Sequence, residues 1–200
     1  MADLTPGVPN ALRPLIRRIV SPTGTNTYLV GIDEIAVIDP GSADPDHVDA
    51  IVGCGGDRIR WVLATSTARG HAQGAAAVAA RTGAQVLGFA IGDGFVPDQE
   101  IGEGFELEAT EFRLLALHTP GVAADHLCYL LEDDRILLSG DLVRGEDGGE
   151  LVPLELDAAR WLASIERLSK LRPPLRGIAP GQGHFIDDAK AALAHELRAA

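Results

Sequence analysis

The sequence predicts a mixed α/β fold in which helices cover the outer faces of two β-sheets, a four-layer αββα sandwich. Two observations indicate this architecture. Strand-like runs joined by hairpin-length gaps form the beginning and the middle of the chain, which favours antiparallel pairing there. Between them a buried strand, an Ala-rich helical segment and a second strand follow in order, and such a βαβ unit packs a helix against a sheet.

The first half of the chain supplies the first predicted sheet. Its opening strands are β-rich, and the gap between them carries Gly and Asp, as a hairpin turn does. The turn Asp39-Pro40-Gly41 precedes a segment whose apolar residues recur at helical spacing, and the strand IRWVLAT is apolar enough to be fully buried. The elements expected here are strands at 27–30, 35–38, 59–65 and 84–89, and helices at 45–52 and roughly 71–82.

The second half predicts a second, largely antiparallel sheet and two further helices. Its strand-like runs are linked by short polar or Gly-bearing segments. Asp157 is a good N-cap for a helix that continues to Lys170 and carries one apolar stripe. Residues 144–150 have the composition of a flexible loop. The other elements expected here are strands at 105–108, 112–118, 126–132, 135–140 and 177–180, and a final helix that opens at Asp187 or Asp188.

Composition and charge restrict the class of protein. The 200 residues, of which 46% are hydrophobic, suffice for one globular domain, and we expect a single domain over residues 1–200. A net charge of -12 opposes binding to nucleic acid or to anionic membranes. Cys54 and Cys128 offer neither a disulfide framework nor a thiolate zinc knuckle, and prolines interrupt the first twenty residues. We therefore expect a cytoplasmic protein that has no membrane segment.

A series of motifs in a fixed order suggests a family. The segments are TGTNTYLVG (23–31), AVIDPG (36–41), VLATSTARGHAQGAAAVAARTGA (62–84), ALHTPGVAADHLCYLLEDDRILLSGDLV (116–143) and IAPGQGHFI (178–186). Together they resemble the metallo-β-lactamase-fold hydrolase superfamily, in particular its β-lactamase-like protein 2 branch. The resemblance implies the metallo-β-lactamase fold, and members of this branch include ribonucleases and thioesterases. We expect no C-terminal helical extension of the kind that this branch carries, which together with the acidic charge disfavours a ribonuclease.

The resemblance also implies a dinuclear zinc site. Its ligands are a His-x-His-x-Asp-His loop, a His after a Thr-Pro-Gly turn, an Asp in a Gly-Asp pair and a His in a final Pro-Gly-His turn, because zinc needs imidazoles and carboxylates to activate a shared water. This chain keeps only His71 and Asp141. The other ligand positions hold Ser66, Ala68, Gly70, Val122 and Gln182. We expect no cofactor, with one Zn²⁺ on His71, Asp141 and either Gln182 or His184 as the alternative.

Each candidate residue also has a purely structural interpretation. His71 lies near a predicted helix N-terminus and Asp141 follows a strand, where caps and turns use such residues. Ser66 could be a nucleophile beside them, but no GxSxG elbow surrounds it. Cys128 is expected to be a small buried hydrophobe. Among the other histidines we expect hydrogen-bonding roles for His118 and His126, a surface position in a glycine loop for His184, and solvent-facing positions for His47 and His195.

The sequence thus predicts a degenerate member of this superfamily that lacks the dinuclear zinc site and is not a zinc hydrolase. Its role would be binding, assembly or regulation, with an unidentified small molecule or protein as partner and with homo-oligomerisation left open. The alternative is a hydrolase of ester, thioester or phosphodiester bonds that uses a reduced single-metal site. Metal-free catalysis in the same cleft has no supporting motif. In each case the candidate residues should converge at one end of the sandwich, since they lie on loops that leave strand ends.

Overall fold

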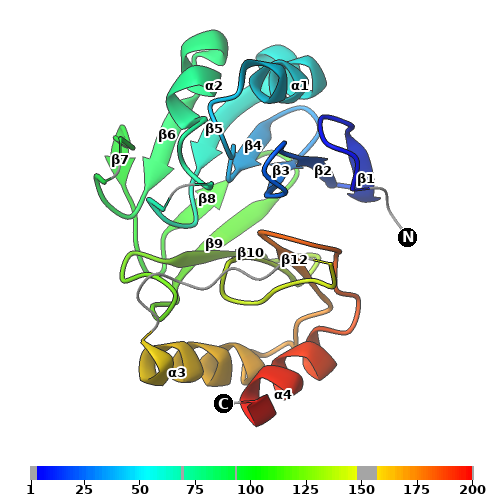
Figure 1. The fold of residues 1–200 in the computed structure, drawn as a ribbon, viewed down its shortest axis with the longest axis vertical. Helices are drawn as coiled ribbons and strands as arrows, with labels where there is room; N and C mark the ends of the chain where they lie inside the picture. The colour runs from blue at the N-terminus through cyan, green and yellow to red at the C-terminus, as the bar shows by residue number, and fades with distance from the viewer. Residues whose placement is uncertain (1–3, 69, 93, 148–156, 200) are drawn as a thin grey trace.

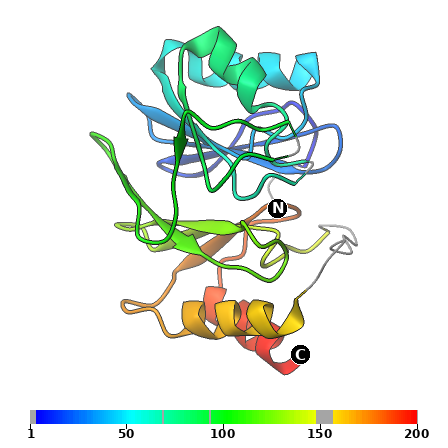
Figure 2. The ribbon, with the colours of Figure 1, turned by 90° about the vertical axis from the view of Figure 1, so that its left-hand side faces the viewer.

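The computed structural model describes residues 4–68, 70–92, 94–147 and 157–199. Two sheets face each other, and a pair of helices covers the outer face of each sheet (Figures 1 and 2). The predicted αββα sandwich is therefore confirmed. None of the helices in the described ranges is long and apolar enough to cross a membrane.

The first sheet has seven strands in the order of the sequence. Strands β1 to β4 pair antiparallel, whereas β4 to β7 pair parallel. Helices α1 and α2 connect the successive parallel strands β4, β5 and β6, because parallel neighbours need a crossover. The elements are β1 (Asn10–Arg13), β2 (Ile16–Val20), β3 (Asn26–Val30), β4 (Ile35–Ile38), α1 (Pro45–Gly55), β5 (Ile59–Leu63), α2 (Ala75–Thr82), β6 (Gln85–Gly88) and β7 (Gln99–Glu100).

The second sheet has five strands in the order β12-β11-β10-β9-β8. Strands β8 to β11 form an antiparallel meander, and β12 joins β11 in parallel after the crossover through α3. The yellow α3 and the red α4 lie together on the outer face of this sheet (Figure 1). The elements are β8 (Glu106–Glu108), β9 (Arg113–His118), β10 (Leu127–Leu131), β11 (Ile136–Gly140), α3 (Ala158–Ser169), β12 (Gly177–Pro180) and α4 (Ala189–Ala199).

The central strands are apolar on both faces because each face packs against another layer. In β4, Ile38 enters the cluster between the sheets, while Val37 enters the cluster beneath α1 and α2. In β11, Leu138 likewise lies between the sheets and Leu137 lies beneath α3 and α4. Alternation of side chains along a strand thus turns one apolar run into two separate cores.

Two expectations for the first half need correction. Helix α2 begins at Ala75 rather than near His71, because the preceding residues form a loop bound to the Asp39-Pro40-Gly41 turn. The N–H of Gly74 donates to the carbonyl of Gly41, and a Cβ on Gly74 would lie 2.8 Å from the carbonyl oxygen of Pro40. The ligand-bearing loop is consequently held against the end of β4.

His47 was expected to face solvent, and this was wrong. It lies in the first turn of α1 and is buried, and its Nε2 lies 2.9 Å from the hydroxyl oxygen of Thr27. Strands β1, β2 and β7 were not predicted from the sequence. Part of the expected loop at 144–150 lies outside the described residues.

Candidate functional site

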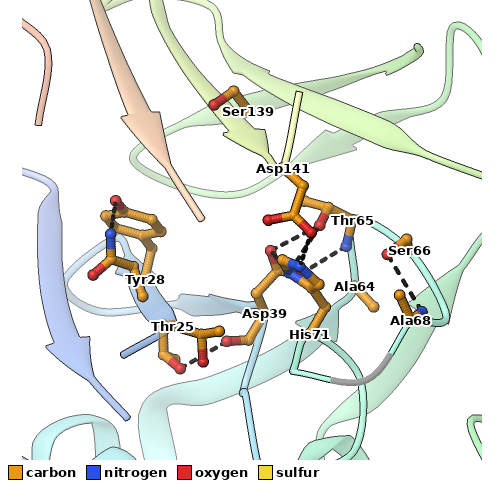
Figure 3. Close-up of polar contacts among 12 residues, drawn as sticks. Thr25, Tyr28, Asp39, Ala64, Thr65, Ser66, Ala68, His71, Ser139 and Asp141 are labelled. Carbon is orange, nitrogen blue, oxygen red and sulfur yellow. Dashed lines mark hydrogen bonds and ion pairs between the residues drawn. The ribbon is translucent and has the colours of Figure 1, made fainter. Parts of the chain in front are cut away.

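Loops that follow three strands meet at one end of the sandwich and bring Asp39, His71 and Asp141 into contact (Figure 3). Asp39 follows β4, His71 lies in the loop after β5, and Asp141 follows β11 of the other sheet. The Nδ1 atom of His71 lies 2.8 Å from Oδ2 of Asp39, and its Nε2 atom lies 2.8 Å from Oδ2 of Asp141. One imidazole therefore joins carboxylates from both sheets; we call Asp39, His71 and Asp141 the Asp–His–Asp triad.

The Asp39 carboxylate is fixed in place by its own neighbours. The backbone N–H of Thr65 donates to Oδ1 at 2.7 Å, and the Thr65 hydroxyl donates to Oδ2 at 2.8 Å. The backbone of Asp39 has a φ of 52°, a left-handed conformation that Asp adopts more readily than most residues. Since Asp39 is 2% exposed, its carboxylate cannot exchange these donors for water.

The electrostatics of the triad favour a protonated imidazole. Burial of His71 opposes its protonation, but the charges and hydrogen bonds of Asp39 and Asp141 outweigh burial and raise the pKa of His71 well above its ordinary value. Burial also acts to raise the pKa of Asp141, yet the hydrogen bond and charge of His71 lower it overall. Both ring nitrogens of His71 then carry protons and donate to carboxylates, so neither offers a lone pair.

A second histidine, His126, lies beside the triad and is neutral. Burial, followed by the positive charge of His71, lowers the pKa of His126 to about 4. Its Nδ1 lies 2.8 Å from the hydroxyl oxygen of Thr119, and that hydroxyl donates to Sγ of Cys128. The Nδ1 atom of His126 must therefore carry the proton and donate it to Thr119, so that Nε2 carries a lone pair and no proton. This buried Nε2 has no partner among the described residues and lies 2.6 Å from the place of a Cβ on Gly140.

The loop at 180–184, which holds the last of the family's ligand positions, is hydrogen-bonded to the first sheet. The side-chain amide of Asn26 and the hydroxyl of Tyr28 both donate to the carbonyl oxygen of Pro180, at 2.9 Å and 2.7 Å. A Cβ on Gly181 would lie 3.1 Å from the imidazole of the triad. The backbone of this loop is thus held beside the triad although its ligand position holds a glutamine.

Four of the candidate cleft residues lie in the two loops that also hold or contact the triad histidine. Ser66 and Ala68 lie in the loop after β5, where the N–H of Ala68 donates to the Ser66 hydroxyl at 3.3 Å (Figure 3). Gly70 approaches the side chain of Thr25, and Thr25 forms an isolated β-bridge with Gln182. Ser66 is not paired with the triad histidine, because both nitrogens of that ring face carboxylates.

The remaining two candidates, Val122 and His184, have no hydrogen bond or ion pair with the triad among the described contacts. Val122 belongs to the loop after β9, which is tied to the site through Asp125, whose carboxylate accepts the N–H of Thr67 at 2.8 Å. His184 turns toward Asp147, with 3.5 Å between Nε2 and Oδ2. As predicted, Cys128 is fully buried, and burial raises the pKa of its thiol to about 12.

The donors at the triad do not meet the coordination requirement of zinc. A protein zinc site uses three or four ligands with free lone pairs. Within the described ranges, no group of three or more His, Cys, Asp or Glu side chains is arranged to hold a metal ion. The replaced ligand positions offer a hydroxyl, an amide or no polar side chain at all.

Sequence reasoning missed Asp39 and Thr65. It assigned Asp39 to a turn and gave Thr65 no role, although the AVIDPG motif at 36–41 contained the relevant signal. The parallel pairing of β4 with β5, which places Ile38 opposite Leu63, makes Asp39 and Thr65 neighbours. Only the strand order reveals this proximity.

Comparison with known proteins identifies the family of the chain. Residues 66–184 match the family described as the Metallo-beta-lactamase superfamily. The lactamase-like protein aptB of Emericella nidulans is 32% identical over 82% of this chain and 53% of its own length, and the atrochrysone carboxyl ACP thioesterase dmxR1 of Cryptosporiopsis sp. is 28% identical over 87% and 53%. The chain spans about half the length of these curated relatives.

The solved structures show the same fold. A metallo-beta-lactamase from Pontibacter korlensis superimposes with a TM-score of 0.79 at 17% sequence identity, covering 96% of this chain and 97% of its own. At this identity the likeness concerns the fold, whereas the match over 66–184 concerns the family. The chain therefore belongs to the metallo-beta-lactamase superfamily, and it places Asp39, His71 and Asp141 at one end of that family's sandwich.

Proposed function

We propose that this chain is a metal-free member of the superfamily, in which the His71 imidazolium provides the positive charge that a metal ion would otherwise supply to Asp141. It acts by binding, assembly or regulation rather than as a zinc hydrolase. The observation that carries this proposal is the pairing of both His71 nitrogens with carboxylates at 2.8 Å. A doubly protonated ring that holds two carboxylates has no remaining lone pair for zinc.

The ligand count supports the same conclusion. A zinc ion beside Asp141 would have two protein ligands at most from the retained family positions, even after His71 lost a proton. Displacing that proton from a buried ion pair would oppose binding further, since metal binding must release it. The partner is an unidentified small molecule or protein, nucleic acid is disfavoured by the charge of -12, and the cytoplasm is the expected location.

Metal analysis of the purified protein tests the proposal. After exposure to excess zinc and desalting, we expect well under one zinc per chain, and a melting temperature that a chelator does not change. Near-stoichiometric zinc would contradict it.

A variant with the ligands restored provides the matched control. It should bind zinc if the backbone still holds the loops in place, because the fold supplies the positions and the new side chains supply the donors. If a folded variant binds no more zinc than the parent in calorimetry, the loops themselves have moved. The restored positions are Ser66→His, Ala68→His, Gly70→Asp, Val122→His and Gln182→His.

The second candidate function is hydrolysis of a thioester through a single-metal site. The names of two relatives favour it: dmxR1 and a protein of Aspergillus terreus that is 29% identical over 87% of this chain are both atrochrysone carboxyl ACP thioesterases. Turnover of acyl-thioester substrates with added zinc, lost in His71→Ala and Asp141→Ala but retained in His184→Ala, would replace the metal-free proposal with this one. If His184→Ala also lost turnover, the third ligand would be His184 rather than Gln182.

A further inference from the structure

A pocket is lined by residues of α3, of α4 and of the segment that follows α3. These two helices cover the outer face of the second sheet (Figure 2). The volume of the pocket is about 400 Å³, within the range of about 300–1,000 Å³ that small-molecule sites occupy. Leucine side chains from both helices and from the segment between α3 and β12 line it. They are Leu168, Leu175, Leu193 and Leu197.

The apolar lining is continuous with the core beneath it. Leu168 is 1% exposed and Leu193 is 3% exposed, and both belong to the cluster that packs against the second sheet. Leu175 and Leu197 are partly buried against the same cluster, so the pocket opens from the core to the surface. An apolar ligand placed there would extend an existing hydrophobic core instead of lying on a polar surface.

Two cationic side chains line the same pocket. Arg172 and Lys190 are exposed, and neither forms an ion pair with a carboxylate within the described part of the chain. Nearby Lys170, by contrast, pairs with Glu166 and does not line the pocket. Because the described ranges provide no carboxylate partner for these two cations, they favour a ligand that carries an anionic group, even in a chain of net charge -12.

We propose that this pocket binds a fatty acid or a similarly slender apolar carboxylate. The hydrocarbon tail packs against the leucines, and the carboxylate lies between Arg172, which can donate two parallel hydrogen bonds, and Lys190. The pocket is separate from the triad, so this inference goes beyond the proposed function and does not depend on it.

Isothermal titration calorimetry with decanoate, below its micelle concentration at pH 7, tests this directly. We expect saturable binding of one decanoate per native chain. Arg172→Gln and Lys190→Gln should each weaken binding about tenfold, because each removes a charge-assisted contact. The matched control Lys170→Gln removes an exposed lysine outside the pocket and should bind as the native chain does.

A second pair of variants tests the location. Ala194 lines the pocket and Ala191 is exposed on the same helix without lining it, so Ala194→Trp should abolish decanoate binding while Ala191→Trp should not. Circular dichroism establishes that each variant is folded. Absence of binding to the native chain, equal affinity for decanol, or undiminished binding by Ala194→Trp would overturn the proposal. The proposal would also be overturned if sedimentation experiments showed that the native chain self-associates and that Ala194→Trp abolishes this. A second copy of the chain would then be the occupant of the pocket.

Discussion

The substitution Asp39→Asn tests whether the triad is a buried ion pair, because it removes one carboxylate and hardly changes the shape of the side chain. Asp39 accepts hydrogen bonds from the N–H and the hydroxyl of Thr65 and from Nδ1 of His71. An asparagine accepts only through its oxygen, so its NH₂ group must face one of these donors. The change therefore removes a buried charge and creates a donor–donor contact at a side chain that is 3% exposed.

We expect Asp39→Asn to lower the free energy of unfolding by about 3–5 kcal/mol, the usual effect of removing one partner of a buried ion pair. In a domain of this size each kcal/mol lowers the melting temperature by roughly 2–4 °C, so the loss should be about 6–20 °C. Urea unfolding at pH 7, followed by circular dichroism, measures the first quantity, and a thermal scan measures the second.

Asp187→Asn is the matched control. Asp187 pairs with Arg13 at the surface, where its side chain is 81% exposed, and its loss should cost less than about 1 kcal/mol. The double variant Asp39→Asn/His71→Gln should cost less than the sum of its single variants, because the two side chains interact directly. A cost below about 1 kcal/mol for Asp39→Asn, or strict additivity in the double variant, would refute the buried ion pair.

The same contact makes stability depend on pH in the alkaline range. Because the folded-state pKa of His71 is raised, its contribution is fully present below the ordinary histidine pKa of about 6.5 and is lost as the pH rises through the folded value. Asp39→Asn should flatten this alkaline loss. Unfolding free energies measured between pH 6 and pH 10 would show an equal slope in both proteins if the reasoning were wrong.

Three further outcomes concern His126, Gly140 and the two cysteines. The folded-state pKa of His126 is about 4, so the unfolded chain binds an extra proton as the pH falls below about 6.5. Urea titrations should therefore show that His126 lowers the free energy of unfolding by about 3 kcal/mol at pH 4. This loss should be absent from His126→Asn. Gly140→Ala should lower the free energy of unfolding by about 3 kcal/mol in the same assay, because its Cβ would lie 2.6 Å from Nε2 of His126. The control Gly83→Ala has a similar positive φ but open space around the new Cβ, and it should lower that free energy by about 1 kcal/mol. A thiol reagent followed by mass spectrometry should label Cys54 and spare fully buried Cys128 until the protein unfolds; equal labelling would contradict the buried thiol.

Much of the architecture was predictable because its central strands are long apolar runs separated by turn residues. The expected runs 27–30 and 35–38 correspond to β3 and β4, and the run 135–140 corresponds to β11. Strands β1 and β2 were not predicted, since β2 contains Arg17 and Arg18 within an apolar pattern. Arg18 is completely buried and donates to the carbonyl of Gly183 at 3.1 Å, a contact between distant segments that no local pattern reveals.

The candidate site was predicted only in part. The retained family positions identified His71 and Asp141, but their mutual contact and the role of Asp39 depend on how the two sheets are placed. His47 was mispredicted for the same reason. Helical spacing placed it on a polar face, whereas in the fold its imidazole is buried and hydrogen-bonded to Thr27 of β3. Local sequence patterns describe each layer, while the contacts between layers decide which polar side chains are buried.

The assignment of strands to sheets has a consequence for how the protein could be divided. Every strand of the first sheet ends before Ile101, and every strand of the second begins after Gly104. A cleavage at residues 102–104 would therefore cut no ladder of either sheet and would yield two fragments, each with its own sheet and its own pair of helices. Asp39 and His71 would lie on one fragment and Asp141 on the other. The triad would then require both fragments, because neither one alone holds all three of its side chains.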